Sequence, residues 1–125
     1  MRTVPVPVLA IVLALPVLAA CSTSGGGSGA PGGEKVAVGV NDQGCTPSTI
    51  EVPSGTTVFA VTNNGTEAGE FEVLQGSQVL DEVENIVPGV TRDMTIDLEP
   101  GTYELICYLD DSPRGTLTVT EAAAS

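Results

Sequence analysis

Residues 103–119 read YELICYLDDSPRGTLTV and contain two alternating apolar patterns joined by a short polar loop. In the first pattern Tyr103, Leu105 and Cys107 occupy every second position, which is typical of a β-strand with one buried face. The second pattern, at 115–119, begins with a glycine and again places apolar side chains at alternate positions. The stretch therefore predicts two neighbouring strands, the first of which ends in a thiol.

The rest of the chain after residue 33 has the same character. Short runs rich in valine, threonine and isoleucine are separated by turn signals such as Asn63-Asn64-Gly65, and no convincing helix is evident. This spacing predicts an all-β sandwich of about seven to eight strands. We expect the strands near residues 36–40, 50–52, 56–62, 71–73, 79–80, 90–98, 103–108 and 114–120.

Residues 1–20 have the pattern of a secretory signal peptide, with a positive charge before an apolar run. The run ends in Leu-Ala-Ala-Cys21, which resembles the bacterial lipobox, so we expect a lipid such as palmitate on Cys21. The Gly/Ser-rich segment 21–33 is then a flexible tether, 34–121 the folded domain and 122–125 a tail. We expect an exported protein that its lipid holds at the membrane, in the periplasm or on the outer face of the cell. An ordinary cleaved signal is the alternative.

The composition excludes several classes of function. The formal net charge is −12, with 16 acidic residues against four basic ones. Nucleic-acid binding is not expected, because contact with phosphates needs a basic patch. The chain has no histidine, no Gly-x-Ser-x-Gly elbow and no phosphate-binding loop, so we expect no enzyme activity. An acidic surface is compatible with cation binding or with solubility alone.

Cys45 and Cys107 are the two thiols of the expected domain, and the sequence leaves two roles open for them. In an exported protein two cysteines most often form a disulfide, which would stabilise a domain by about 2–4 kcal/mol. As free thiolates they would instead be ligands for soft or borderline metal ions.

Three groups of carboxylates are candidates for a metal site. Glu70 and Glu72 are two positions apart, so on a strand both lie on the face opposite Phe71. A second group is the aspartate pair at 110–111, shortly after Cys107. Carboxylates suit hard cations, and a site that mixes them with thiolates would take iron, copper or zinc. Taken singly, the same acids are typical surface charges that protect strand edges. The remaining group consists of Asp81, Glu82 and Glu84.

Segment 41–65, NDQGCTPSTIEVPSGTTVFAVTNNG, resembles the opening of a cupredoxin domain, and the strand–loop–strand pattern quoted above resembles a cupredoxin metal loop. The resemblance implies a Greek-key β-sandwich. It places Glu70 where copper cupredoxins carry their first histidine, Cys107 at the copper cysteine and Asp110 where the second histidine is expected. No sulfur stands at the methionine position, which residues 113–115 fill.

A more specific resemblance is to the N-terminal cupredoxin-like domain of EfeO-type iron-uptake proteins. It covers essentially all of residues 35–120 and is carried by ENIVPG at 84–89 and CYLDDSPRG at 107–115. It implies binding of copper or iron through cysteine and acidic side chains, and partners such as a metal permease or a peptidase-like protein. The large peptidase-like domain of the family, with its H-x-x-E motif, has no counterpart in this sequence, so only the cupredoxin part carries over.

These patterns lead to one hypothesis and one alternative. The hypothesis is a lipid-anchored, extracytoplasmic, cupredoxin-like protein that binds copper or iron at one end of the sandwich. The alternative is a metal-free structural or interaction sandwich with a Cys45–Cys107 disulfide. The predicted ligands are Cys45, Glu70 and Cys107 with Asp110 or Glu72 nearby, and those of a second, acidic site are Asp81, Glu82 and Glu84.

Overall fold

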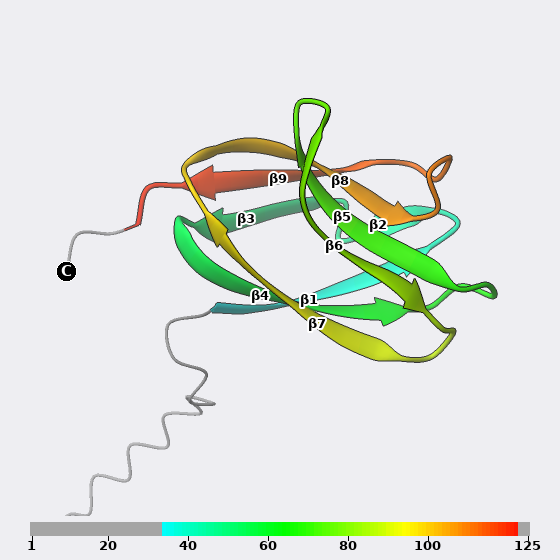
Figure 1. The fold of residues 1–125 in the computed structure, drawn as a ribbon. Helices are drawn as coiled ribbons and strands as arrows, with labels where there is room; N and C mark the ends of the chain where they lie inside the picture. The colour runs from blue at the N-terminus through cyan, green and yellow to red at the C-terminus, as the bar shows by residue number, and fades with distance from the viewer. Residues whose placement is uncertain (1–33, 123–125) are drawn as a thin grey trace, which may run out of the picture.

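The computed structural model describes residues 34–122, which contain nine β-strands (Figure 1). Within this range no helix is long and apolar enough to cross a membrane. The strands are β1 (Glu34–Asn41), β2 (Gly44–Thr46), β3 (Thr49–Pro53), β4 (Gly55–Asn63), β5 (Gly69–Gln75), β6 (Gln78–Ile86), β7 (Thr91–Leu98), β8 (Gly101–Tyr108) and β9 (Gly115–Thr120).

The strands are arranged in two sheets that pack face to face (Figure 1). The four-stranded sheet has the order β2-β1-β4-β7, and the five-stranded sheet has the order β3-β9-β8-β5-β6. β1 runs parallel to β4 and β3 runs parallel to β9, whereas the other neighbours are antiparallel. β5 therefore lies between β8 and the edge strand β6.

The core lies between the two sheets, because apolar side chains alternate along most strands. Phe59 and Val61 of β4 and Leu105 of β8 are fully buried there. The rings of Phe59 and Phe71 meet across the sheets, with centroids 5.2 Å apart and planes tilted by 53°. The same alternation decides which side chains of β5 and β8 point outward, and those side chains form the surface described below.

The predicted all-β sandwich is confirmed, with nine strands in the described range instead of seven or eight. The additional strand is β2, which has three residues and is too short to show an alternating pattern; the pairing of Val40 with Cys45 holds it in place. The short strand expected at 79–80 is in fact the nine-residue β6. The strand is longer than expected because β6 is an edge strand. An edge strand is largely exposed and tolerates charged side chains, which interrupt the apolar alternation by which a strand is recognised.

Four features of the sequence lie outside the described residues: the expected signal peptide (1–20), the lipidated Cys21, the tether (21–33) and the last three residues of the tail (123–125). The predicted roles of the first three in export and membrane attachment rest on the sequence pattern.

Candidate metal-binding surface

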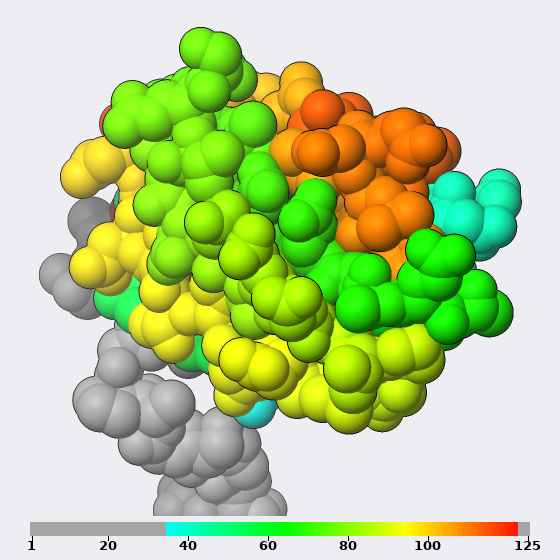
Figure 2. Space-filling view, turned by 45° about the vertical axis from the view of Figure 1, so that its right-hand side comes forward, coloured from blue at the N-terminus to red at the C-terminus, as the bar shows by residue number. Residues whose placement is uncertain are grey.

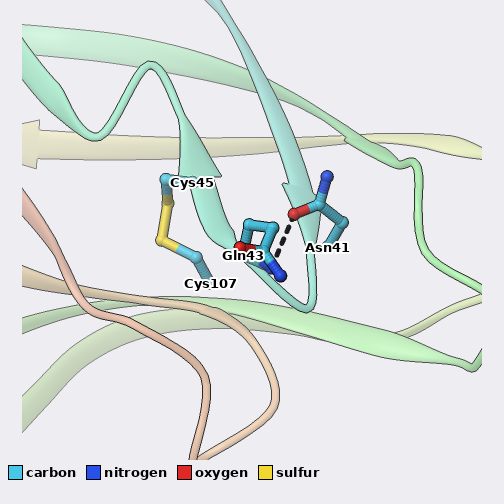
Figure 3. The surroundings of a disulfide bond; sticks show 4 residues. All are labelled: Asn41, Gln43, Cys45 and Cys107. Atoms are coloured by element: carbon cyan, nitrogen blue, oxygen red, sulfur yellow. Dashed lines mark hydrogen bonds between the residues drawn. A yellow bond between two sulfur atoms is a disulfide. The ribbon is translucent and has the colours of Figure 1, made fainter.

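Cys45 of β2 and Cys107 of β8 are joined in a disulfide bond (Figure 3). Their Cα atoms are 5.1 Å apart, and the two residues are 5% and 0% exposed. Because β2 belongs to the four-stranded sheet and β8 to the five-stranded sheet, the bond links the two sheets through the core. Both sulfur atoms are in the bridge, so neither is a thiolate ligand in this structure.

A tight turn between β1 and β2 brings Cys45 to the bridge. Asn41 pairs with Gly44, and the backbone N–H of Gln43 donates a hydrogen bond to Asn41 Oδ1 at 2.8 Å (Figure 3). Gly44 has φ +96°, and a Cβ atom there would lie 2.5 Å from the carbonyl oxygen of Pro113. Glycine is required at this position by the backbone conformation and by the close packing of the turn against the loop after β8.

Glu70 and Glu72 lie on β5, on the opposite face of the sheet from the disulfide. Phe71, between them, pairs directly with Cys107, and both of these side chains are fully buried in the core. Because side chains alternate along a strand, Glu70 and Glu72 point to the outer surface. The structure does not bring the predicted mixed site together: the five-stranded sheet itself separates the sulfur atoms of Cys45 and Cys107 from the two carboxylates.

The edge strand β6 places two further carboxylates beside this pair. Glu82 pairs directly with Glu72 across the strands, and Glu84 lies on the same outer face. Asp81 pairs with Val73 and therefore lies on the other face, where its Oδ1 accepts the backbone N–H of Glu82 at 2.9 Å. The predicted second site of Asp81, Glu82 and Glu84 is thus divided between the two faces of β6.

Asp110, in the loop after β8, belongs to the same group of outward carboxylates. Burial raises the pKa of Glu70, and the charges of Asp110, Glu84 and Glu82 raise it further, in that order. Figure 2 shows β5 and β6, in green to yellow-green, next to the orange loop on one face of the molecule. We call the following five residues the carboxylate array: Glu70, Glu72, Glu82, Glu84 and Asp110.

Glu72 is the most buried member of the carboxylate array, with 8% of its surface exposed. Burial raises the pKa of its carboxyl, and the charges of Glu70, Glu82 and Asp110 raise it further. Within residues 34–122 no hydrogen bond or ion pair reaches this carboxylate. A carboxylate on a largely buried side chain that makes no ion pair is costly, so a cation would be stabilised more at Glu72 than at a fully exposed acid.

The carboxylate array is open and is not a preformed metal centre. In the described part of the chain, no three His, Cys, Asp or Glu side chains are grouped so that they could hold a metal ion. A cation would have to draw glutamate side chains together from two strands and a loop. Each glutamate that becomes fixed loses about 1.5–2 kcal/mol of side-chain entropy, which favours weak and reversible binding.

Tyr108, which the sequence did not single out, shapes the end of β8 beside the carboxylate array. Its φ is +100°, and its hydroxyl oxygen accepts hydrogen bonds from the N–H groups of Thr66 at 3.1 Å and Glu67 at 2.8 Å. A Cβ atom at Gly65 or Gly69 would lie 2.4 Å or 2.6 Å from the ring. A pocket of about 330 Å³ opens beside this ring. In the sequence, the packing of the Tyr108 ring is indicated only by Gly65 and Gly69. Two glycines at this spacing are too common to predict such a contact.

A profile of the cupredoxin-like domain matches residues 9–119, which is most of the sequence. The chain belongs to the cupredoxin-like family. Solved cupredoxin structures agree at the level of the fold. Reduced auracyanin from Roseiflexus castenholzii superposes with a TM-score of 0.62 at 14% identity, over 69% of this chain and 96% of auracyanin. Auracyanin A, a blue copper protein from Chloroflexus aurantiacus, gives 0.58 at 16% identity, over 70% and 100% of the two chains.

Relatives at higher identity are components of iron uptake systems. This cupredoxin-like chain is 47% identical over 90 residues to EfeO of Yersinia pestis, and 42% identical over 91 residues to EfeO of Escherichia coli K12. The matches cover 72% and 73% of this chain but 24% of each EfeO, so the chain spans about a quarter of the length of these relatives. The predicted resemblance to the EfeO cupredoxin-like domain is confirmed.

The ligands of a blue-copper centre are not present in this cupredoxin-like domain. Such a centre uses two histidines and a cysteine, with a weak axial ligand. The sequence contains no histidine, and Cys107, which the resemblance places at the copper cysteine, is in the disulfide. A blue-copper centre therefore does not fit these residues. The carboxylate array instead offers oxygen ligands, which hard cations prefer.

Glu72→Gln is expected to stabilise the metal-free protein at pH 7 by roughly 0.5–1 kcal/mol, because Glu72 and Glu82 are like charges directly opposite each other on neighbouring strands. The raised pKa of Glu72 means that the folded state binds this proton more tightly than the unfolded state does. The resulting stabilisation is complete below the unfolded pKa of 4.5 and is lost as the pH rises through the folded pKa. Wild type should therefore gain stability relative to the variant as the pH falls from 7 towards 4.5.

Urea denaturation at several pH values, with a chelator present, measures this difference. Glu51→Gln is the control, because Glu51 is an exposed carboxylate on β3, outside the carboxylate array. If the two variants had the same stability profile with pH, repulsion within the carboxylate array would not be the cause.

Proposed function

We propose that this protein is an extracytoplasmic cation-binding module of an iron-uptake system, and that the carboxylate array takes up iron as cargo. The likeness to EfeO, an iron uptake system component, supports the uptake role. The observation that carries the proposal is Glu72. Its side chain is largely buried, lies among other acids of the carboxylate array and makes no ion pair within residues 34–122.

Carboxylate oxygens suit iron as a hard cation, and they suit ferric iron most of all. Five acids on one face of a chain with net charge −12 also raise the local concentration of cations. Because the carboxylate array is spread over two strands and a loop, it favours exchange of its cargo over retention. We infer a role in transfer, without catalysis, and with iron rather than copper as the ion.

We also infer that Cys21 carries a lipid and that the segment 21–33 is a spacer between the membrane and the folded domain. An anchored copy would present the carboxylate array to a membrane-associated partner, such as a metal permease or a peptidase-like protein. Support for this arrangement comes from the sequence pattern and from the likeness to EfeO.

A second candidate is a metal-free structural or interaction sandwich. The Cys45–Cys107 disulfide favours it, as does the lack of a three-ligand group among the residues that the structure describes. The two candidates differ in whether the oxidised protein binds a metal ion at all.

Calorimetric titration of the oxidised protein with Fe²⁺ under anaerobic conditions separates these candidates. We expect Fe²⁺ to bind, and we expect Glu70→Gln/Glu72→Gln to weaken binding by at least roughly tenfold, because two carboxylates nearest the centre of the array lose their charge. The matched control is Glu51→Gln/Glu99→Gln, which removes two exposed charges outside the carboxylate array and should change the affinity by less than about twofold.

Absence of Fe²⁺ binding by the wild type would reject the proposal and favour the metal-free sandwich. A clear preference for Cu²⁺ in a parallel titration would contradict iron as the cargo. Binding that requires reduction and is lost in Cys45→Ala/Cys107→Ala would assign the ligands to the thiols.

A further inference from the structure

Arg114 is the one cationic residue of the five-stranded sheet and its adjoining loops within residues 34–122. Lys35 lies on the four-stranded sheet, where its Nζ is 3.1 Å from Asp93 Oδ2, and Arg92 lies on β7 of the same sheet. Arg114 immediately precedes β9, and its Nη1 lies 3.4 Å from Oε1 of Glu104 on β8. Its position therefore sets it apart from the other described cations.

A single strand, β8, separates Arg114 from Glu72 of the carboxylate array. Gly115 pairs with Leu105 in the antiparallel β8–β9 ladder, so Arg114 is next to Ile106. Ile106 in turn pairs with Glu72 of β5. Neighbouring strands are about 4.8 Å apart, so the backbones at Arg114 and Glu72 are about 10 Å apart, a gap that the two long side chains can narrow.

Arg114 lies on the same outer face of the five-stranded sheet as Glu72. Residues opposite each other on neighbouring strands point to the same side, and Arg114, Ile106 and Glu72 are such neighbours in turn. Within residues 34–122 no other basic residue lies on this sheet. Arg114 is also exposed, so its side chain can move when the charge beside it changes.

We propose that Arg114 is a built-in counter-ion of the carboxylate array, which stabilises the array when no metal is bound and competes with an incoming cation. This inference rests on the proposed function of the array. The ion pair with Glu104 keeps the guanidinium on this face of the sheet. Arg114 thereby lowers the affinity for iron and helps the cargo to leave.

The test is anaerobic Fe²⁺ titration of the oxidised full chain at low ionic strength. Arg114→Gln is expected to bind Fe²⁺ roughly three- to tenfold more tightly than wild type, because one opposing charge near the array is removed. Arg114→Lys keeps the charge and should restore the affinity of wild type. The gain in Arg114→Gln should shrink in about 0.5 M salt, which screens exposed charges.

Lys35→Gln is the matched control, because Lys35 is also a cation in an exposed ion pair but lies on the other sheet. It should change Fe²⁺ affinity by less than about twofold. Equal gains in Lys35→Gln and Arg114→Gln would overturn the proposal, since net charge alone would then explain both. In a Glu72→Gln background the effect of Arg114→Gln should become smaller, and an undiminished effect would also count against it.

A readout without metal keeps this inference separate from the proposed function. In chelator at pH 7, Arg114→Gln should lower the melting temperature more than Lys35→Gln does, because the carboxylate array loses its counter-ion. Equal melting temperatures would overturn the role of Arg114 even if Fe²⁺ binds. If wild type binds no Fe²⁺ but the melting temperatures differ as expected, the uptake function fails while the counter-ion role within the array stands.

Discussion

Replacement of both Cys45 and Cys107 by alanine is expected to lower the free energy of unfolding by about 4 kcal/mol, because the bridge spans 62 residues and restricts a long loop of the unfolded chain. The stability of a small domain is typically about 5–15 kcal/mol, so this loss is a large share of the total. The bond also links the two sheets across the core. Urea denaturation of the oxidised wild type and the variant measures the difference.

Reduction of the wild type should produce a loss of similar size, and the alanine variant should not respond to the reductant. The prediction fails if thiol titration shows complete reduction while the denaturation midpoint stays unchanged. At a temperature where the variant is folded it should still bind Fe²⁺, because the carboxylate array lies on the other face of the five-stranded sheet from Cys107.

Asn63→Ala is expected to lower the free energy of unfolding by about 3 kcal/mol, because the change leaves three backbone groups without a partner. Asn63 is fully buried at the end of β4. Its Nδ2 donates to the carbonyl oxygens of Glu67 at 2.7 Å and Ile86 at 2.6 Å. Its Oδ1 accepts the N–H of Gly65 at 2.7 Å. Thermal and urea denaturation measure the loss.

The same substitution should also weaken Fe²⁺ binding. Ile86 ends β6 and Glu67 lies just before β5, so Asn63 holds the ends of the two strands that carry most of the carboxylate array. Asn64→Ala is the control, since Asn64 is the exposed neighbour, and it should cost less than about 0.5 kcal/mol. Equal losses at the two positions would show that the buried amide has no special role.

The strands with a regular alternating pattern were predictable from the sequence. The strand expected at 56–62 is β4 (Gly55–Asn63), and the one expected at 103–108 is β8 (Gly101–Tyr108). Both are interior strands with a clear buried face, so alternation revealed them. β6 was reduced to two residues in the prediction because it lies at a sheet edge, where solvent accepts charges on both faces.

The candidate site was predictable in its chemistry but not in its assembly. Glu70, Glu72 and Asp110 were recognised as ligand candidates, and the structure places all three on one surface with two acids of β6. The sequence also predicted the sulfur of Cys107 as a ligand there. In the structure Cys107 pairs with Phe71 and points into the core, so its sulfur does not reach that surface. Arg114 had no recognisable role until the register of β8 and β9 placed it near Glu72.

The sequence by itself determined the kinds of ligand that this protein can offer. A chain without histidine and with 16 acidic residues offers carboxylates as its main metal ligands, with or without its thiols, because composition is a property of the residues alone. Only the tertiary structure decided which of them act together. Whether two side chains share a face depends on the register between strands far apart in sequence, such as β5 and β8, and hydrogen bonds and core packing set that register. The register directs Cys107 inward to Cys45 and turns Glu70 and Glu72 outward, so the disulfide and the carboxylate array lie on opposite faces of one sheet.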